Sequence, residues 1–263
     1  MPESALLSLP THRVGPVPFR VAPFDDCVAA ILAAGGDAIG QAVHFANAYT
    51  IALADADPAY AELLADPSAA VFTDGVPVAW LGRRFYPDVA ATWHRVYGPD
   101  VMTAVFDADT EVRHFLLGGS PETLVALQQA IAQRWPRAKV VAAESPPFRP
   151  MTAAEVAAQD QRIRQSGAEL VWVGLGTPKQ DHEVARLAAE LPVVALAVGA
   201  AFDFLAGTKP QAPLWMQRSG TEWAFRLASE PKRLTRRYLW GNPRFLRAAL
   251  RDRPRRPVLR RGR

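Results

Sequence analysis

The sequence predicts an α/β protein with a Rossmann-like, doubly wound and mostly parallel sheet. Short apolar runs alternate with amphipathic segments along the chain, which is typical of a parallel sheet covered by helices on both faces. Hydrophobic residues make up 49% and charged residues 21% of the 263 residues, so the chain can bury a sizeable core. This length and composition favour one large domain with an appendage.

Six apolar runs are the predicted strands, at 39–45, 69–72, 112–117, 140–143, 170–173 and 193–198. The amphipathic segments predict helices near 58–65, 76–85, 99–107, 121–135, 152–166 and 178–190, after a first helix that begins near residue 25. Ser120-Pro121-Glu122 is a clear helix start, with an N-cap, a proline in the first turn and an acid beside it. Six strands are enough for a doubly wound sheet.

The chain divides into three predicted segments. Residues 1–23 contain five prolines and little periodicity, so we expect an irregular N-terminal arm. Residues 24–208 form the predicted α/β body, and residues 209–263 form a basic helical appendage. The appendage holds 16 lysines and arginines and 3 acidic residues, whereas residues 1–208 hold 14 and 23. This asymmetry predicts an anionic partner near the C-terminus: phospholipid, lipid pyrophosphate or nucleic acid.

Cysteine, histidine and hydropathy restrict the class of protein. Cys27 is the single cysteine, which excludes an intramolecular disulfide and a thiolate metal cluster and suits a reducing cytoplasm. The five histidines lack ligand spacing, and the aspartate pairs at 55/57 and 107/109 are interpreted as solvated helix caps, so we expect no metal. The chain has no uncharged apolar stretch of about 18 residues and no secretory signal pattern. We therefore expect a cytoplasmic protein.

The segment VWVGLGTPKQ predicts a buried strand, a glycine turn and a helix start. Gly174 and Gly176 would let the backbone approach a phosphate closely, beside a helix that begins at Pro178. Lys179 could neutralise charge, and Gln180 could hydrogen-bond a base or a sugar. Neither a dinucleotide fingerprint nor a P-loop is present, so a plain strand-to-helix turn is an equally good interpretation of the spacing.

Thr73-Asp74-Gly75 follows the second predicted strand and precedes a helix. Asp74 would therefore lie at the carboxyl edge of the sheet, where open α/β folds bind ligands. An aspartate there can accept the proton of an attacking hydroxyl, although an N-cap role for Asp74 is equally favoured. Because a helix N-terminus lowers the pKa of an aspartate, a base would need burial or a carboxylate neighbour.

Three more polar residues follow predicted strands or precede turns. Arg95 could bind a diphosphate through its fork, although a lone arginine is more often a surface residue. Asn47 could contact a substrate amide or form a turn. Asp203 could bind a ribose, support the site or cap a helix.

Aromatic and basic residues interleave at helical spacing in the last third of the chain. For residues 212–230 the favoured interpretation is a helix docked on the body, and for 232–263 the excess of arginine favours an anionic surface. Four cations of this segment are candidates for reaching the active site: Arg218, Arg226, Lys232 and Arg233.

Taken together, these segments resemble the WecG/TagA/CpsF family of glycosyltransferases, classed as glycosyltransferase family 26. The resemblance rests on residues 73–75, 95–100, 174–180, 198–203 and 212–238, in family order, and spans about residues 38–246. It implies an inverting bacterial enzyme that transfers a sugar from a UDP-sugar to a polyprenyl-diphosphate-linked saccharide in surface polysaccharide synthesis. This chain has Phe45 where the family often has threonine and a longer segment before Arg95, which leaves the donor sugar open among N-acetylmannosamine-type, glucosyl and uronic acid residues.

Carried over by position, the resemblance implies that Asp74 is the general base and that Arg95 binds diphosphate. Gln180 and the glycine turn would hold the nucleotide, with Asn47 in the donor pocket. The resemblance implies a UDP-sugar as donor substrate, no other cofactor, and peripheral association with an anionic membrane at the inner face of the cell membrane. A homo-oligomer is compatible with the sequence.

Two other function classes fit parts of the sequence. A nicotinamide oxidoreductase shares the expected fold, but its glycine fingerprint is missing. A nucleic-acid-binding module would account for the basic tail and the isoelectric point near 9.5. We expect no nucleic acid partner, and binding of NADH without UDP, or salt-sensitive binding of nucleic acid without vesicle binding, would favour these alternatives.

Overall fold

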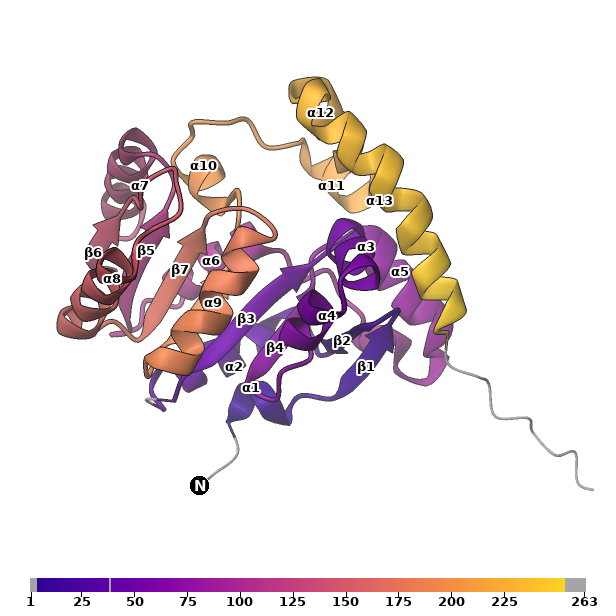
Figure 1. The fold of residues 1–263 in the computed structure, drawn as a ribbon, viewed down its shortest axis with the longest axis horizontal. Coiled ribbons are helices and arrows are strands. Elements are labelled where there is room, and N and C mark those ends of the chain that lie inside the picture. Colours follow the sequence, from indigo (N-terminus) through magenta and orange to yellow (C-terminus); the bar gives the residue numbers. More distant parts are fainter. Residues whose placement is uncertain (1–3, 38, 254–263) are drawn as a thin grey trace, which may run out of the picture.

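The structure is a computed structural model that describes residues 4–37 and 39–253. A six-stranded sheet lies at its centre in the order β4-β3-β8-β7-β5-β6, and every neighbouring pair of strands is parallel (Figure 1). The strands are β3 (Gln41–Ala46), β4 (Ala69–Thr73), β5 (Arg113–Gly118), β6 (Lys139–Glu144), β7 (Leu170–Gly174) and β8 (Val194–Ala197). All six predicted strands are present, and the Rossmann-like α/β fold is confirmed.

Helices cover both faces of this sheet (Figure 1). One face packs against α2 (Phe24–Gly35), α6 (Gly98–Asp107), α7 (Pro121–Arg134) and α10 (Ala201–Leu205). The other packs against α8 (Ala153–Ser166) and α9 (Lys179–Glu190). Side chains alternate between the faces along a strand, so Val43 and Phe45 of β3 join the first core and Ala42 joins the second. The predicted cap of α7 is confirmed, because the Ser120 hydroxyl accepts from the Thr123 amide at 3.1 Å.

The N-terminal segment is not the irregular arm that its prolines suggested. It contains α1 (Ala5–Ser8) and a hairpin of β1 (Thr11–Val14) and β2 (Val17–Arg20), which buries Val14, Val17 and Phe19. Pro16 lies in the turn beside Gly15, whose φ of +60° suits glycine. Pro18 lies on a strand that pairs on one side alone, where the missing amide donor is tolerated. The prolines therefore mark the hairpin instead of preventing it.

The segments after β3 and β4 fold around this hairpin. After β3 come α3 (Ala48–Ala56) and α4 (Pro58–Leu64), and after β4 come α5 (Val76–Phe85) and a 3₁₀ helix, Pro87–Thr92. The sequence did not predict α3, because its buried residues point to several sides instead of forming one apolar stripe. Asp57 caps α4 as expected, but Asp55 of α3 is buried. The solvated-cap interpretation of Asp55 is therefore wrong.

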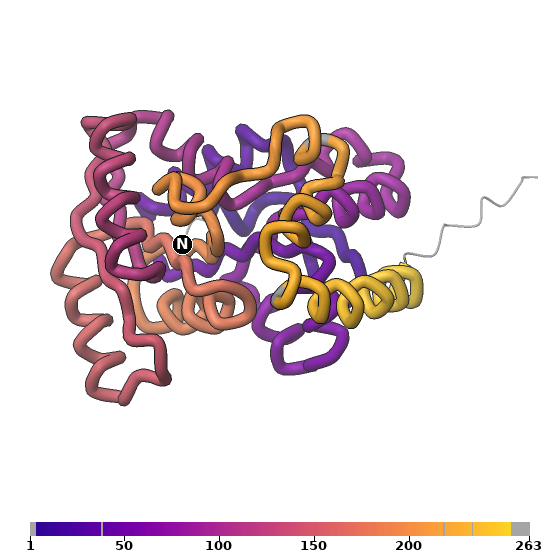
Figure 2. The backbone as a smooth tube through the Cα atoms, turned by 90° about the horizontal axis from the view of Figure 1, so that it is seen from above, coloured from indigo at the N-terminus to yellow at the C-terminus, as the bar shows by residue number. Residues whose placement is uncertain are grey.

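The C-terminal segment contains α11 (Leu214–Ser219), α12 (Glu222–Ser229) and α13 (Pro231–Arg251). Seen from above, the chain after α10 crosses over the molecule, turns through α11 and α12, and ends in the long yellow helix α13 (Figure 2). α13 packs along α3 and joins the same core as the hairpin, so this helix is no separate unit. The division at residue 208 stays a prediction. None of the helices in residues 4–37 and 39–253 is long and apolar enough to cross a membrane.

Candidate active site

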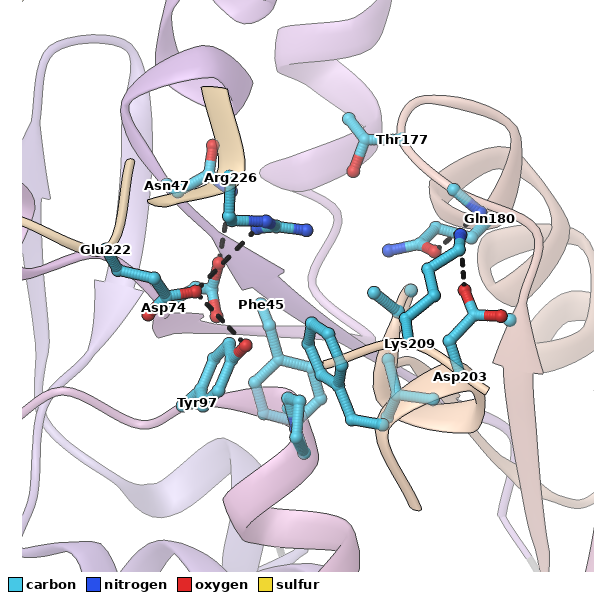
Figure 3. A pocket seen from close by; sticks show the side chains of 18 of the residues that line it. Phe45, Asn47, Asp74, Tyr97, Thr177, Gln180, Asp203, Lys209, Glu222 and Arg226 are labelled. Atoms are coloured by element: carbon cyan, nitrogen blue, oxygen red, sulfur yellow. Dashed lines mark hydrogen bonds and ion pairs between the residues drawn. The ribbon is translucent and has the colours of Figure 1, made fainter. Parts of the chain in front are cut away.

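A cavity opens where the strand order reverses. The chain leaves β3 toward β4 on one side, whereas β8, the other neighbour of β3, is reached from β7. Open α/β sheets bind ligands outside the carboxyl ends of the strands at such a point. Here the cavity has a volume of about 580 Å³, and its lining includes Phe45, Asn47, residues 174–177, residues 197–200 and several residues of α12 (Figure 3).

Gln180 supports the glycine turn that forms one wall of this cavity. Its Oε1 accepts from the Gly176 amide at 2.9 Å, and its Nε2 donates to the Ala197 carbonyl oxygen at 2.8 Å. Gly176 has a φ of +77°, which glycine adopts without strain. Gln180 is buried and spans from β8 to the turn after β7, so its amide already has protein partners on both sides. It lines the cavity and shapes its wall, and the expected contact with a base or a sugar stays a prediction.

Lys179 and Pro178 do not line the cavity. Pro178 is the N-cap of α9, and Lys179 is exposed, with its Nζ 5.4 Å from the centre of the Phe148 ring. The lysine that does line the cavity is Lys209, which is paired with Asp203 at 2.9 Å. Gln180 occupies the side of the helix start that faces the strand ends, and this directs Lys179 outward.

Asp74 lies directly after β4, and its side chain faces the cavity. Its Oδ2 accepts from Nδ2 of Asn47 at 3.0 Å. The N-cap of α5 is Gly75, and no side chain caps this helix, so the N-cap interpretation of Asp74 is wrong. A Cβ on Gly75 would come within 3.3 Å of Cβ of Asn47, so the glycine allows the close approach. Thr73 is buried and supports the turn through its carbonyl oxygen, which accepts from the Val96 amide at 2.6 Å.

Asn47 links Asp74 to the start of α3. Its Oδ1 accepts from the amides of Tyr49 and Thr50, at 3.0 and 3.4 Å, so it is the N-cap of this helix. The same oxygen lies 3.5 Å from Nη2 of Arg237, a donor from α13. Asn47 therefore caps the helix and lines the cavity at once, which joins the two interpretations that the sequence left open.

The surroundings of Asp74 favour a proton acceptor. Burial raises the pKa of Asp74 above the usual range of an aspartate, and the carboxylate of Glu222 raises it further. The guanidinium of Arg95 and the amide of Asn47 act in the opposite direction. A base is most effective when its pKa lies close to the working pH, so the raised pKa suits Asp74 to accept a proton. Burial and a carboxylate neighbour are the two features that were expected to raise the pKa of a base at this helix start.

Arg95 is engaged with the protein itself. Its Nη2 lies 2.6 Å from Oε2 of Glu222, and its Nε donates to the Asp74 carbonyl oxygen at 3.0 Å. Arg226 and Arg237 line the cavity instead. Lys232 is exposed and lines neither this cavity nor the smaller one beside it. The side chains of Arg218 and Arg233 lie outside the described part of the structure.

A second cavity, of about 330 Å³, adjoins the first between α5, α12 and α13. Its apolar lining includes Val76, Pro77, Trp223, Leu234, Phe245 and Leu246, and its charged lining includes Arg95, Arg226 and Arg237. Asn47, Asp74, Tyr97 and Glu222 line both cavities. Asp74 is therefore accessible from two chambers of different polarity.

A family model described as the glycosyl transferase WecG/TagA/CpsF family matches residues 12–258. The chain belongs to this family. It is a glycosyltransferase, which implies a sugar-nucleotide donor and a glycan acceptor, and the family points to synthesis of cell-surface polysaccharides. The match favours this class over an oxidoreductase or a nucleic-acid-binding module, because it covers both the body and the basic helices.

Several residues that face the cavities of this glycosyltransferase were not singled out from the sequence. They are Tyr97, Lys209, Glu222 and Arg237. Glu222 and Arg237 belong to the segment 212–238 and Tyr97 to the segment 95–100, which both resemble the family, and this resemblance was the available signal. Spacing along a helix shows which residues share a face, but it does not show where that face is placed in the fold.

The metal requirement of this glycosyltransferase is not tested by the structure. Within residues 4–37 and 39–253, no group of three His, Cys, Asp or Glu side chains is placed to hold a metal ion. The expectation of no metal site stays a prediction from the sequence.

Proposed function

We propose that this glycosyltransferase transfers a sugar from a UDP-sugar to a hydroxyl of a polyprenyl-diphosphate-linked saccharide, with inversion and with Asp74 as general base. The observation that carries the proposal is the position of Asp74 in the lining of both cavities. A donor in one cavity and an acceptor in the other would meet at this carboxylate. Inverting transfer by a single displacement needs one base at that meeting point.

The larger cavity suits the donor. Its volume of about 580 Å³ is in the range of clefts that enclose a small ligand. The turn at Gly174 and Gly176 exposes backbone at one wall, and Arg226, Arg237 and Lys209 supply positive charge. A nucleoside diphosphate needs close backbone contacts and cations for its phosphates, so this lining matches the charged half of a UDP-sugar.

The smaller cavity suits the acceptor. Its wall combines apolar side chains from α5 and α13 with guanidinium groups. A polyprenyl diphosphate has the same combination, because an apolar chain is joined to an anionic head. Leu246 lines this cavity and is 51% exposed, so the cavity extends toward the solvent face of α13.

That face of α13 has the composition of an interfacial helix. Leu239, Leu246 and Leu250 are more than half exposed and follow one another at spacings of seven and four residues. Arg236 and Arg247 are exposed on the same helix. Leucines beside arginines at helical spacing favour the surface of an anionic bilayer, and a lipid-linked acceptor would then enter the smaller cavity from the membrane.

The proposed reaction is one displacement. The acceptor hydroxyl attacks the anomeric carbon, and its proton passes to Asp74 as the new glycosidic bond forms. The bond between the anomeric carbon and the phosphate oxygen breaks, and the electron pair leaves with UDP. Arg226 and Arg237 would stabilise the charge that develops on the diphosphate. Attack opposite the leaving group inverts the anomeric configuration.

The test compares Asp74→Asn with Asp88→Asn, the same change at an exposed position. Transfer from a panel of UDP-sugars to a short-chain prenyl-diphosphate-linked saccharide would be measured, together with UDP binding by calorimetry. We expect turnover of Asp74→Asn to fall by about 10²-fold or more, with UDP affinity retained, because the base alone is removed. Near-normal turnover would remove Asp74 from the reaction, and a product that keeps the donor's anomeric configuration would exclude the single displacement.

A further inference from the structure

Glu222, the first residue of α12, is the centre of a polar junction with the body. Its Oε2 pairs with Nη2 of Arg95 at 2.6 Å. Its Oε1 accepts from the Tyr97 hydroxyl at 3.3 Å (Figure 3). Nη1 of Arg226 lies 3.9 Å from the same Oε1. The side chain of Glu222 is 14% exposed, so these partners shield it from most solvent.

Arg95 extends the junction to the segment that holds the base. While its Nη2 pairs with Glu222, its Nε donates to the backbone carbonyl oxygen of Asp74 at 3.0 Å. The guanidinium also lies 3.8 Å from the centre of the Tyr97 ring, which restricts its position further. The guanidinium group is planar and rigid, so a change in the position of Glu222 would also move the contacts of Arg95 with Asp74 and Tyr97.

α12 makes little apolar contact with the body. None of its eight residues, all of them described, is buried. Trp223 contacts the ring of Tyr238 in α13, whereas the hydrogen bonds and ion pairs that join α12 to the body are made by Glu222. The pair between Glu222 and Arg95 is the shortest of these among the described residues.

We propose that Glu222 is a positioning residue that, through Arg95, fixes α12 over the two cavities and holds the Asp74 segment in its reactive geometry. This inference rests on the proposed function, because it concerns the same reaction. It also accounts for Arg95, whose guanidinium is turned toward Glu222 and away from the larger cavity. The diphosphate of the donor would then be bound by Arg226 and Arg237.

The charge of Glu222 has a second consequence for Asp74. The ionisable and polar groups around Asp74 are Asn47 of the α3 cap, Arg95 and Tyr97 before α6, Asp100 of α6, Glu222 and Arg226 of α12, and Arg237 of α13 beyond Asn47. In this set Glu222 offsets part of the positive charge of Arg95 and Arg226. Without it, the cations would favour the ionised form of Asp74 more strongly and would lower its pKa.

The first test is the pH profile of Glu222→Gln. This change keeps the shape of the side chain and removes its charge. A base acts when it is ionised, so transfer rises with pH through the pKa of Asp74; when that pKa falls, the acidic limb of kcat moves to lower pH. We expect a shift of about 0.5 pH unit or more and a fall in kcat of about tenfold. Glu62→Gln, at an exposed position of α4, is the matched control.

The second test needs no catalysis. Hydrogen–deuterium exchange of residues 222–229 should become faster in Glu222→Gln and also in Arg95→Gln, which breaks the same pair from the body. Exchange in α9 should stay unchanged in both variants. In a variant that carries both Glu222→Gln and Arg95→Gln, the loss of kcat should be no larger than in the more affected single variant, because Glu222 and Arg95 act as one unit.

The outcomes separate this inference from the proposed function. If Asp74→Asn abolishes transfer while Glu222→Gln leaves kcat, the acidic limb and the exchange of α12 unchanged, Glu222 has no positioning role and the proposed function stands. If Asp74→Asn transfers normally, the proposed function fails. Faster exchange in α12 with an unmoved acidic limb and unchanged kcat would reduce Glu222 to a structural contact and overturn the inference.

Discussion

α12 and α13 follow one another in the chain but are held to the body by different forces. α13 buries Leu234, Phe245, Ala248 and Ala249, the last three of them in the core that contains the N-terminal hairpin and α3. Asp55 of α3 adds ion pairs of 2.8 Å to Arg244 and Arg251. By contrast, α12 has no buried residue within its fully described length. It contacts the body through Glu222, which pairs with Arg95, and through Arg226, whose guanidinium lies 6.0 Å from the centre of the Phe204 ring. One helix is packed, and the other is held by polar contacts.

This difference shows where the molecule can open. Buried apolar area stabilises a contact without regard to direction, and losing it costs several kcal/mol per large side chain. A polar junction near solvent is worth far less and weakens as salt is added. We therefore expect α12 to move away from the cavities while α13 stays docked. Both cavities lie under α12, so this movement would admit donor and acceptor.

The sequence divided docking and surface binding between these helices differently. It favoured docking for residues 212–230 and an anionic surface for residues 232–263. In the structure α13 is the docked helix, because its small and aromatic residues at 245, 248 and 249 meet α3 and the turn at Gly15. The exposed leucines and arginines of α13 lie on its other side, so one helix serves both purposes. Deleting residues 232–263 would therefore expose core and would not test membrane attachment cleanly.

The largest expected effect is on stability, from Phe245→Ala in α13. Its side chain is 4% exposed, and the substitution would leave a cavity beside the hairpin core. We expect a loss of about 3 kcal/mol in the free energy of unfolding, measured by urea denaturation. Leu239→Ala on the exposed side of the same helix should change it by less than about 0.5 kcal/mol. Equal losses in the two variants would mean that packing does not hold α13.

A smaller effect is expected on donor affinity, from Arg226→Gln in α12. Arg226 lines both cavities and carries a charge that a diphosphate would pair with. Losing a charge-assisted contact of about 1.5–3 kcal/mol should weaken UDP binding by about ten- to a hundredfold in calorimetry. The Tm should change little, because α12 buries no side chain. Arg95 lines the smaller of the two cavities but not the larger, so Arg95→Gln should weaken UDP binding less. A larger loss of UDP affinity in Arg95→Gln than in Arg226→Gln would indicate that Arg95 binds the diphosphate.

The sheet and its helices could be predicted because strands that are buried on both faces appear in the sequence as continuous apolar runs. The buried runs of β3, β4 and β7 read as apolar segments of the right length, and the cap at Ser120 has its own local signal. The hairpin and α3 had no such signal. The prolines of the hairpin suggested an irregular segment. α3 is buried on several sides, so its apolar residues follow no clear helical period.

The site could be predicted where position follows from the strand ends. Asp74, Asn47 and the glycine turn lie at the carboxyl edge because a strand ends just before each of them. The partners of these residues could not be predicted. Glu222 meets Arg95 across 127 residues of chain, through a helix whose placement depends on how α13 packs. The choice between Lys179 and Gln180 at the start of α9 likewise depends on the rotation of the helix, which spacing does not show.

The smallest expected effect concerns the exposed side of α13, which separates membrane attachment from packing on one helix. Arg247→Ala removes an exposed charge and should weaken binding to anionic vesicles by about fivefold, since a basic residue near such a surface contributes about 1 kcal/mol. Flotation with phosphatidylserine-containing liposomes at low salt measures it, and the difference should shrink at high salt. Arg164→Ala is the matched control, because Arg164 is exposed on α8, which lies beside β6 at the opposite end of the sheet from α13. An equal loss in both variants would assign attachment to overall charge, whereas a loss confined to Arg247→Ala would place the bilayer against the face of α13 that borders the smaller cavity.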